Sequence, residues 1–434
     1  MAKVLFQSTN PRLLRSTLVG YLYEIAQEHQ VVLLADGMDD YTKSLLQDKG
    51  LFPGLANIIF FESPFGKNVV RKNSRLHAIL AKAVNGYKPD VVIVPSDLWP
   101  AEMYLLRLAK RARAVTLAMQ PGFKMAEQKR LLWWAYQNSC ARMPSFLPLS
   151  VKMPIAKTKK FLGYALYHWI LPLAAGEMPF AGKASFIFWD ESSGKRDADF
   201  TAVFSKRDRE LCIKDGVLAE KIFVLGHPLE HTGTRKFFEK AYSAHGKTRE
   251  DSKTLTIMWP GEKVGFREQD HSLISEQDIW GRRVSTVKRI AAHLGDWKIF
   301  IKPHPTEKEA AQIKESLERI SPSVAVVNSL EPAEKYIEMS QCIVGISLPS
   351  TTLFTAQKQY PGKIILSLNL DNEFLGDSYK DFEGIEYIDT EEKLDETVHA
   401  IGNETYRKEG EGTETFDFGS AAELVNYVYA KRIS

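Results

Sequence analysis

The sequence predicts an α/β protein of two similarly built domains, each with a parallel β-sheet covered by helices on both faces. The chain has 434 residues, more than one hydrophobic core usually fills, so two domains of roughly 200 residues each are expected. Short apolar runs alternate with helical patterns, and this alternation restarts near Thr254 after a polar stretch. Such alternation is typical of parallel sheets whose strands are joined by crossover helices.

The first half contains five strand-like runs with helical patterns between several of them. Each run is short, rich in β-branched residues and bounded by polar or turn-forming residues. Strands are expected at Lys3–Gln7, Val31–Ala35, Asn57–Phe61, Asp90–Pro95 and Ala114–Met119, and helices at Leu13–Glu28, Val69–Asn85 and Ala101–Arg113. Beyond an aromatic and basic segment, strands at Phe200–Ser205 and Lys221–Leu225 flank a short helix at Arg207–Asp215.

The second half repeats the pattern. Strands are expected at Thr254–Trp259, Lys298–Lys302, Val324–Asn328, Cys342–Ile346 and Lys363–Leu368, and helices at Ser285–Leu294, Ala310–Ile320, Pro332–Met339, Leu353–Lys358 and Glu391–Ile401. We therefore expect an N-terminal domain at 1–230, a polar linker at 231–253 and a C-terminal domain at 254–418. The amphipathic residues 419–434 are expected to form a helix that packs back on the first domain.

Charge is unevenly distributed along the chain. The whole sequence carries a net charge of +3, but residues 124–183 hold nine basic and two acidic residues, a net charge of +7 against −4 elsewhere. Aromatic residues, among them Trp133, Trp134 and Trp169, lie between the lysines. This composition favours docking on an anionic membrane surface. The alternative is an ordinary helical insertion with core aromatics and solvated lysines. A nucleic-acid partner is not expected, because no recognition motif is present.

The composition also bears on compartment and metal use. Cys140, Cys212 and Cys342 are widely spaced, which indicates a reducing compartment without a disulfide framework. The N-terminus has no signal-peptide pattern, and no run reaches the ~18 apolar residues of a membrane span. No His, Cys, Asp or Glu cluster has metal-site spacing. We therefore expect a cytoplasmic protein, peripheral on the inner face of the cell membrane, that needs no metal and no cofactor.

Two strand ends in the second half predict a phosphate site. The run Trp297–Ile301 ends in Lys302, His304 and Pro305, and the run Cys342–Ile346 ends in Ser350, Thr351 and Thr352. Ligands of open α/β sheets bind at such carboxyl ends. The N–H groups of the Ser-Thr-Thr turn would face an anion at a helix start, while Lys302 and His304 would add a charge and a donor. Gly261, in the loop after the first strand of this half, would let the backbone approach a phosphate.

Two Rossmann-like halves with these motifs resemble the GT-B architecture of nucleotide-sugar glycosyltransferases. Lys302-Pro303-His304-Pro305 is similar to the histidine-proline motif, and Ser350-Thr351-Thr352 to the serine/threonine motif, of bacterial sialyltransferases and related capsule and lipopolysaccharide transferases. The resemblance implies two domains facing a central cleft and a nucleotide held by these motifs. It also implies that Gly226-His227-Pro228 precedes the hinge, as in GT-B sugar-nucleotide epimerases, and that Gln120-Pro121-Gly122 belongs to a surface-polysaccharide enzyme.

Three carboxylates are candidates for the catalytic base, which an inverting transfer needs on the acceptor hydroxyl. Asp190 and Glu191 follow the apolar run Phe186–Trp189 and resemble the acidic motif of sialyltransferases, although Ser192-Ser193 separate them from the glycine. A solvated turn is the alternative for this segment. Asp97, at another predicted strand end, is the second candidate.

The resulting hypothesis is an inverting, metal-independent glycosyltransferase with a nucleotide-sugar substrate. A CMP-linked acid sugar such as sialic acid or Kdo is the favoured donor, and a UDP-sugar is the alternative. The acceptor would be a surface glycan or a lipid-linked molecule. Two other functions remain open: a sugar-nucleotide epimerase of the GT-B type, and a scaffold that binds glycan or nucleotide without turnover.

Overall fold

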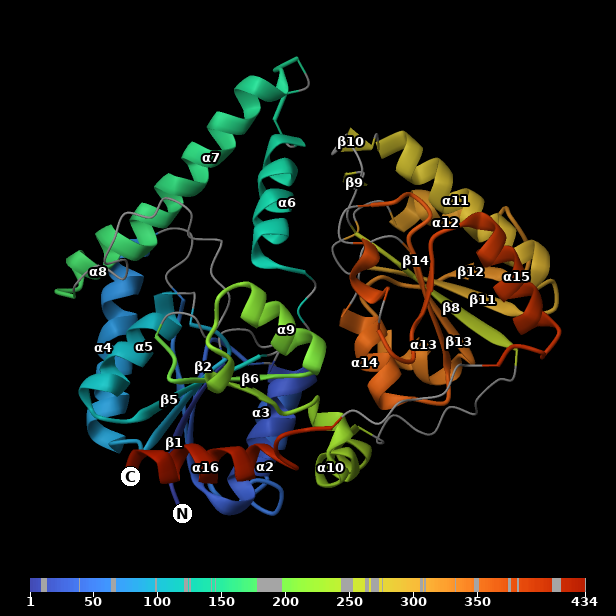
Figure 1. Cartoon of the computed structure of the whole chain (residues 1–434). Coiled ribbons are helices and arrows are strands. Elements are labelled where there is room, and N and C mark those ends of the chain that lie inside the picture. The colour runs from blue at the N-terminus through green and yellow to red at the C-terminus, as the bar shows by residue number, and fades with distance from the viewer. Residues whose placement is uncertain are drawn as a thin grey trace. The chain divides into compact units, whose positions relative to one another are not determined.

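The computed structural model divides the chain into two compact α/β units. It describes residues 1–8, 14–38, 40–63, 68–97, 100–120, 124, 126–141, 143–144, 146–177, 197–242, 253–261, 265–266, 273–274, 276–304, 307, 310–331, 333–346, 351–373, 376–380, 382–407 and 415–433. Unit 1 comprises Met1–Tyr136, Pro148–Ala244 and Glu414–Ser434, and unit 2 comprises Gln137–Leu147 and His245–Thr413. In each unit a sheet lies between layers of helices (Figure 1).

A seven-stranded parallel sheet forms the centre of unit 1. Its strand order is β3-β2-β1-β4-β5-β6-β7, with strands at Lys3–Ser8, Gln30–Ala35, Leu55–Phe60, Val91–Val94, Val115–Met119, Phe200–Val203 and Ile222–Val224 for β1 to β7. The order reverses between β1 and β4, which is the Rossmann arrangement. Apart from β3, which is largely exposed, the strands form where the sequence predicts them because their apolar runs are buried; all four residues of β4 are inaccessible.

Helices cover both faces of this sheet. On one face α4 (Val69–Tyr87) and α5 (Pro100–Arg111) enclose a core with Leu5, Val92 and Val94. On the other, α2 (Val19–Glu28) packs on β2, and α16 (Ala421–Ile433) packs on α2, β4 and β5. Further helices in the described part of unit 1 are η1 (Leu14–Leu18), α3 (Asp40–Gln47), α7 (Leu149–Ala165), η2 (Leu166–Ile170), α8 (Leu171–Ala174), α9 (Lys206–Lys214), η4 (Ala219–Lys221), η5 (Pro228–Glu230) and α10 (Thr232–Tyr242). Helix α6 (Gln128–Ala141) spans the unit boundary.

The polar stretch expected to be a linker from residue 231 contains a helix instead. Residues Thr232–Tyr242 form α10, which packs on α2 within unit 1. Phe237 stacks on Tyr23 of α2 with ring centroids 4.4 Å apart. Gly20 makes this contact close, since a Cβ there would lie 2.6 Å from Cβ of Pro228 and 2.9 Å from Thr234. The first part of the expected linker is therefore helical and belongs to unit 1.

Unit 2 repeats the Rossmann arrangement with six parallel strands. Their order is β12-β11-β8-β13-β14-β15, with strands at Thr254–Trp259 (β8), Lys298–Pro303 (β11), Val324–Val326 (β12), Cys342–Ile346 (β13), Ile364–Leu368 (β14) and Glu386–Ile388 (β15). A core on one face joins the sheet to α11 (Glu276–His293), α12 (Ala310–Leu317) and α15 (Glu391–Gly402). Opposite it lie α13 (Ala333–Met339) and α14 (Thr351–Gln359); a small hairpin, Gly265–Phe266 with Leu273–Ile274 (β9 and β10), and η7 (Gly376–Tyr379) complete the unit.

Taken together, the two sheets confirm the predicted fold class, an α/β protein with two Rossmann-like domains. Among the helices that the structure describes, none combines the length and hydrophobicity needed to cross a bilayer.

Candidate functional site

The strand order of unit 2 places its candidate ligand site at the carboxyl ends of β11, β8 and β13. These three strands are direct neighbours and run parallel, so their carboxyl ends share one edge of the sheet. The order reverses beside β8, and ligands of open α/β sheets bind where that reversal leaves a crevice. Gly261 follows β8, His304 follows β11, and α14 begins after β13. The sequence motifs thus come from adjacent positions on one edge.

His304 stands at the end of β11 with an exposed side chain. Its backbone N–H donates to the carbonyl of Trp259 at 2.9 Å, and its own carbonyl accepts from Glu307 N at 2.9 Å. These bonds join the end of β11 to the end of β8 and fix where the imidazole emerges. An exposed imidazole at this edge has the access that a phosphate ligand requires. Pro305 lies outside the described residues.

Lys302 differs from its neighbour. Its side chain is 4% exposed, and Nζ donates to the carbonyls of Pro303 and Ser329, both at 2.9 Å. Burial lowers the pKa of this amine, against the smaller opposite effects of Glu334 and Glu331. Because two of its three N–H groups are engaged by backbone carbonyls, we assign Lys302 a structural role at the end of β11. The expected phosphate contact of Lys302 stays a prediction.

The start of α14 is held closely against the end of β13. Gly345 of β13 permits this, because a Cβ there would lie 2.4 Å from Cδ1 of Leu353 on α14. The helix begins at Thr351, two residues earlier than expected, so the backbone N–H groups of Thr351 and Thr352 belong to its first turn. Such N–H groups, with the helix dipole, form an anion site. Ser350 lies outside the described residues.

Polar residues after β14 add to this edge and were missed by the sequence analysis. Asp371 is buried and accepts from Arg282 Nη1 at 2.5 Å. Glu373 is 2% exposed. The backbone N–H of this residue donates to Asn369 Oδ1 at 2.8 Å. β14 is the neighbour of β13, so these carboxylates belong to the same edge of the sheet. The signal was present in the sequence, since Asp371-Asn372-Glu373 follows an apolar strand in the same way as the other motifs do.

Unit 1 has its own carboxyl edge, and Asp97 lies there after β4. Its side chain is fully buried, and Oδ2 accepts from the backbone N–H groups of Asp197 at 3.2 Å and Ala198 at 3.5 Å. These bonds hold the segment that enters β6. A base must reach the acceptor hydroxyl. In this structure Asp97 is buried and holds backbone N–H groups, and its place among the candidate bases stays a prediction. Asp190 and Glu191 lie outside the described residues.

Two amides at the same edge of unit 1 are of a different kind. Gln7, near the end of β1, is fully buried, and within the described part of the chain neither polar atom of its amide has a hydrogen-bond partner. Gln120, after β5, likewise has a buried Oε1 without one. An unpaired buried amide costs about 1–3 kcal/mol, so a group outside the described residues or a ligand would stabilise these amides by pairing with them. The signal for Gln7 is a lone amide in an otherwise apolar strand.

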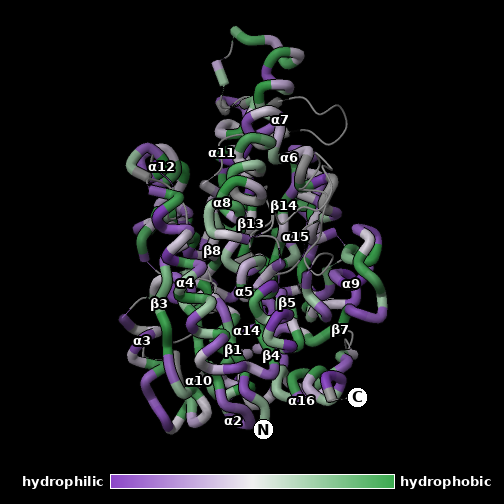
Figure 2. The backbone as a smooth tube through the Cα atoms, turned by 90° about the vertical axis from the view of Figure 1, so that its left-hand side faces the viewer, coloured by the Kyte–Doolittle hydropathy of each residue, from purple (hydrophilic) through white to green (hydrophobic). Residues whose placement is uncertain are grey.

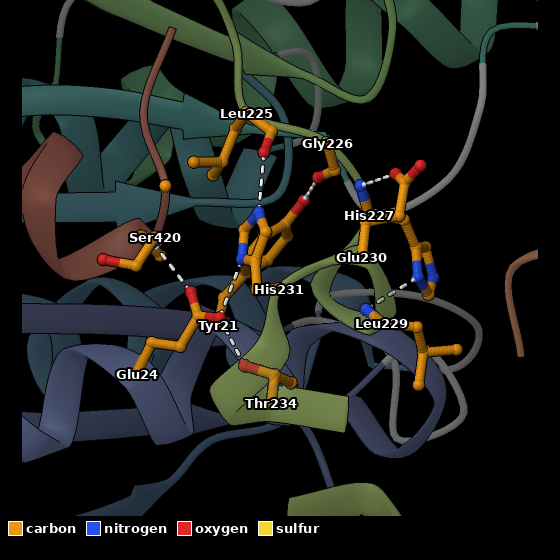
Figure 3. Close-up of polar contacts among 12 residues, drawn as sticks. Tyr21, Glu24, Leu225, Gly226, His227, Leu229, Glu230, His231, Thr234 and Ser420 are labelled. Carbon is orange, nitrogen blue, oxygen red and sulfur yellow. Dashed lines mark hydrogen bonds and ion pairs between the residues drawn. The ribbon is translucent and has the colours of Figure 1, made fainter. Parts of the chain in front are cut away.

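Residues His227 to Thr234 lie where helices α2, α10 and α16 of unit 1 meet. The His227 backbone N–H donates to Glu230, and its Nδ1 accepts from Leu229 N at 3.2 Å, which fixes the turn after β7. Next to it, His231 lies between the Glu24 carboxylate and the Leu225 carbonyl (Figure 3). Glu24 also accepts from Thr234 and from the backbone N–H of Ala421, the first residue of α16. The contacts of His227 set the direction of the chain after β7.

Among the described residues, no group of three His, Cys, Asp or Glu side chains could hold a metal ion. Metal independence stays a prediction.

Comparisons with known proteins show the fold. The sequence matches no protein-family model and no curated protein. Among solved structures, the chain is similar to UDP-GlcNAc 2-epimerase from Methanocaldococcus jannaschii (12% identity, TM-score 0.56, 99% of each chain) and to UDP-GlcNAc 2-epimerase from Neisseria meningitidis bound to UDP-GlcNAc (13%, 0.53, 99% of this chain and 100% of that one). It is also similar to the glycotransferase of kitacinnamycin (12%, 0.54, 100% and 99%). At these identities the similarity shows the GT-B type of fold alone.

Proposed function

We propose that this protein is an enzyme that acts on a nucleotide sugar, and more specifically an inverting, metal-independent glycosyltransferase. The observation that carries the proposal is the convergence of His304, Gly261 and the start of α14 on one edge of the unit 2 sheet, beside its point of strand reversal. The full-length similarity to sugar-nucleotide enzymes of GT-B type supports the same chemistry.

In this proposal unit 2 binds the donor. The N–H groups of Thr351 and Thr352 and the imidazole of His304 stabilise the leaving phosphate, on which charge develops in the transition state. The Gly261 loop approaches the phosphates through its backbone, and Ser350 adds a hydroxyl. No charge from Lys302 is needed, because N–H donors and a helix dipole suffice for an anion.

The acceptor would bind to unit 1. Gln7 and Gln120 have amide atoms that no described residue pairs, at the edge where a hydroxylated acceptor would lie. Asp190 or Glu191 would then remove the proton from the acceptor hydroxyl. We further propose a surface glycan or a lipid-linked acceptor and a peripheral position on the cytoplasmic face of the membrane.

Two donors are compatible with this scheme. The motif resemblance favours a CMP-linked acid sugar, such as sialic acid or Kdo. Several structural neighbours, among them the Neisseria enzyme solved with UDP-GlcNAc, support a UDP-sugar. Those neighbours also favour one alternative function, a sugar-nucleotide 2-epimerase.

Thermal shift with CMP-, UDP- and GDP-sugars identifies the donor, and NMR of the incubated sugar nucleotide separates the two activities. A transferase releases nucleotide only when a lipid-linked or glycan acceptor is added. An epimerase changes the sugar of UDP-GlcNAc without any acceptor. If none of these nucleotide sugars stabilises the protein, the proposed function is wrong.

A further inference from the structure

Helix α7 exposes an apolar stripe. Val151, Ile155 and Leu162 are 43%, 45% and 61% exposed. At about 100° per residue, their positions i, i+4 and i+11 fall within about 40° of one another around the helix axis. The apolar stripe of a helix in a globular domain normally faces the core. Here it faces outward, and the exposed Ile170 and Leu173 extend the apolar surface into η2 and α8.

The C-terminal end of this segment, at α8 and Glu177, is bound to α4 and α5. The side-chain amide of Asn73 on α4 donates to the Leu171 carbonyl at 3.0 Å. Glu177 accepts from Arg111 Nη1 of α5 at 2.7 Å and pairs with His77 of α4 at 2.9 Å. The Arg111 bond lowers the pKa of Glu177, burial opposes it, and His77 adds to the lowering. α8 is thus anchored on α4, and α7 extends from it beyond the helices of unit 1 (Figure 1).

The charges of this region have one sign. Between Gln128 and Gly176 the sequence has seven Lys or Arg residues and no Asp or Glu. Lys152 and Lys159, two helical turns apart, lie within about 60° of the apolar stripe on the same side of α7. Figure 2 shows hydrophobic and hydrophilic residues close together along this helix. A partner that matches the surface must therefore be both apolar and negatively charged.

We propose that the outward face of α7 docks on an anionic lipid bilayer, with Val151, Ile155 and Leu162 in the acyl boundary and Lys152 and Lys159 at the headgroups. A bilayer of this kind offers apolar depth and negative charge together. A second copy of the same surface would bring like charges together, which opposes self-association. The inference rests on the proposed function in one respect: docking would hold the enzyme beside the lipid-linked acceptor that we propose for it.

The test is co-sedimentation of the full chain with phosphatidylglycerol-containing and pure phosphatidylcholine vesicles. One variant pair removes the stripe (Ile155→Ser with Leu162→Ser), and a second removes the flanking charge (Lys152→Gln with Lys159→Gln). The matched controls are Ile213→Ser with Leu218→Ser, which are also exposed apolar positions of unit 1, and Lys43→Gln with Lys236→Gln. All these side chains are at least partly exposed, so folded variants are expected, and circular dichroism checks this.

Binding is expected only with anionic vesicles. It should weaken as salt is raised from about 0.05 to about 0.5 M, because the Debye length shortens roughly threefold over this range. The lysine pair should lower the partition coefficient about 30-fold, and the apolar pair at least about tenfold, while both controls remain within about threefold. Equal binding to both vesicle types, no binding to either, or equal loss in variants and controls would overturn the proposal. So would a dimer in sedimentation velocity that the apolar pair converts to monomer.

The outcome is distinguishable from that of the proposed function. Thermal shift with nucleotide sugars on the same variants reports on unit 2, whereas sedimentation reports on α7. Vesicle binding without any nucleotide-sugar stabilisation would retain the docking surface and reject the enzyme. Nucleotide-sugar stabilisation without vesicle binding would support the enzyme and reject the docking surface.

Discussion

Removal of the Glu24 carboxylate should release α16 from unit 1. Glu24 is 7% exposed; it accepts from His231 Nδ1 at 2.7 Å, from Ala421 N at 2.7 Å and from Thr234. The second ring nitrogen of His231 faces the Leu225 carbonyl at 2.8 Å. With an acceptor at each nitrogen, the ring satisfies both only as an imidazolium. Glu24→Ala therefore leaves His231 Nδ1, the Thr234 hydroxyl and the buried N–H group of Ala421 without their acceptor.

Breaking a buried ion pair by removing one partner costs about 3–5 kcal/mol. At 1.4 kcal/mol per tenfold change, amide exchange in α16, opening as a local unit, should accelerate by roughly 10²- to 4 × 10³-fold. Hydrogen exchange with mass spectrometry on peptides of 415–433 measures this. Local exchange is preferable to global unfolding here, since a chain of two units does not unfold as one transition.

Glu28→Ala is the matched control, because Glu28 is also a carboxylate of α2 that contacts α16, through Asn426 at 2.9 Å, but it is exposed. Its loss should change α16 exchange only a few-fold. Peptides of α15 in unit 2 should not change in either variant. Similar exchange of α16 in Glu24→Ala and Glu28→Ala would refute the assigned role of the Glu24 carboxylate.

The same cluster has a pH dependence with a definite sign. Burial lowers the pKa of His231, but the Glu24 hydrogen bond and charge and the Leu225 carbonyl outweigh it, so the pKa is raised overall. A raised pKa in the folded state adds stability that is fully present below the unfolded value of about 6.5. That stability is lost as pH rises through the folded pKa. Protection of α16 should therefore fall across this window, and Glu24→Ala should remove the dependence.

Three further predictions concern the site. His304→Ala should lose roughly 2–4 kcal/mol of donor binding or leaving-group stabilisation, measured as nucleotide-sugar affinity and turnover; unchanged kinetics in this variant and in Ser350→Ala/Thr351→Ala would remove the phosphate-site argument. Asp190→Asn or Glu191→Gln, but not both equally, should lower turnover and leave nucleotide affinity intact, and full turnover in both would exclude this pair as the base. Gln7→Met should raise the stability of unit 1 by about 1–3 kcal/mol and weaken acceptor binding; destabilisation would show that the amide is already satisfied.

Strands were the best-predicted part of the fold. Most strands of the two parallel sheets lie in buried apolar runs; β3 is largely exposed, and short strands such as β15, with three residues, carry too little pattern. α10 was missed because its sequence is polar apart from Phe237 and Phe238, and its stability comes from α2, some two hundred residues away. Pattern alone does not reveal a partner so distant in the chain.

For the site, sequence predicted positions better than roles. The ends of β11 and β13 meet at one edge as expected, because parallel strands place their carboxyl ends together. The side chains of Lys302 and Asp97 contact backbone groups, which the sequence did not indicate, because a charged residue at a strand end can turn inward as readily as outward and only the packing decides. Gln7 shows the converse: it is a neutral strand residue, and its buried amide atoms have no partner among the residues that the structure describes.

The route of the chain through unit 1 has a consequence for synthesis. Domains usually fold in the order in which the ribosome releases them. Here unit 1 contains both Met1 and α16, and its Glu24 and Asp90 side chains contact Ala421 and Arg432. Every residue of unit 2 therefore leaves the ribosome before the last helix of unit 1. Until α16 is synthesised, the surface of the nascent N-terminal sheet that α16 covers stays exposed. Unit 1 is therefore begun before unit 2 and completed after it.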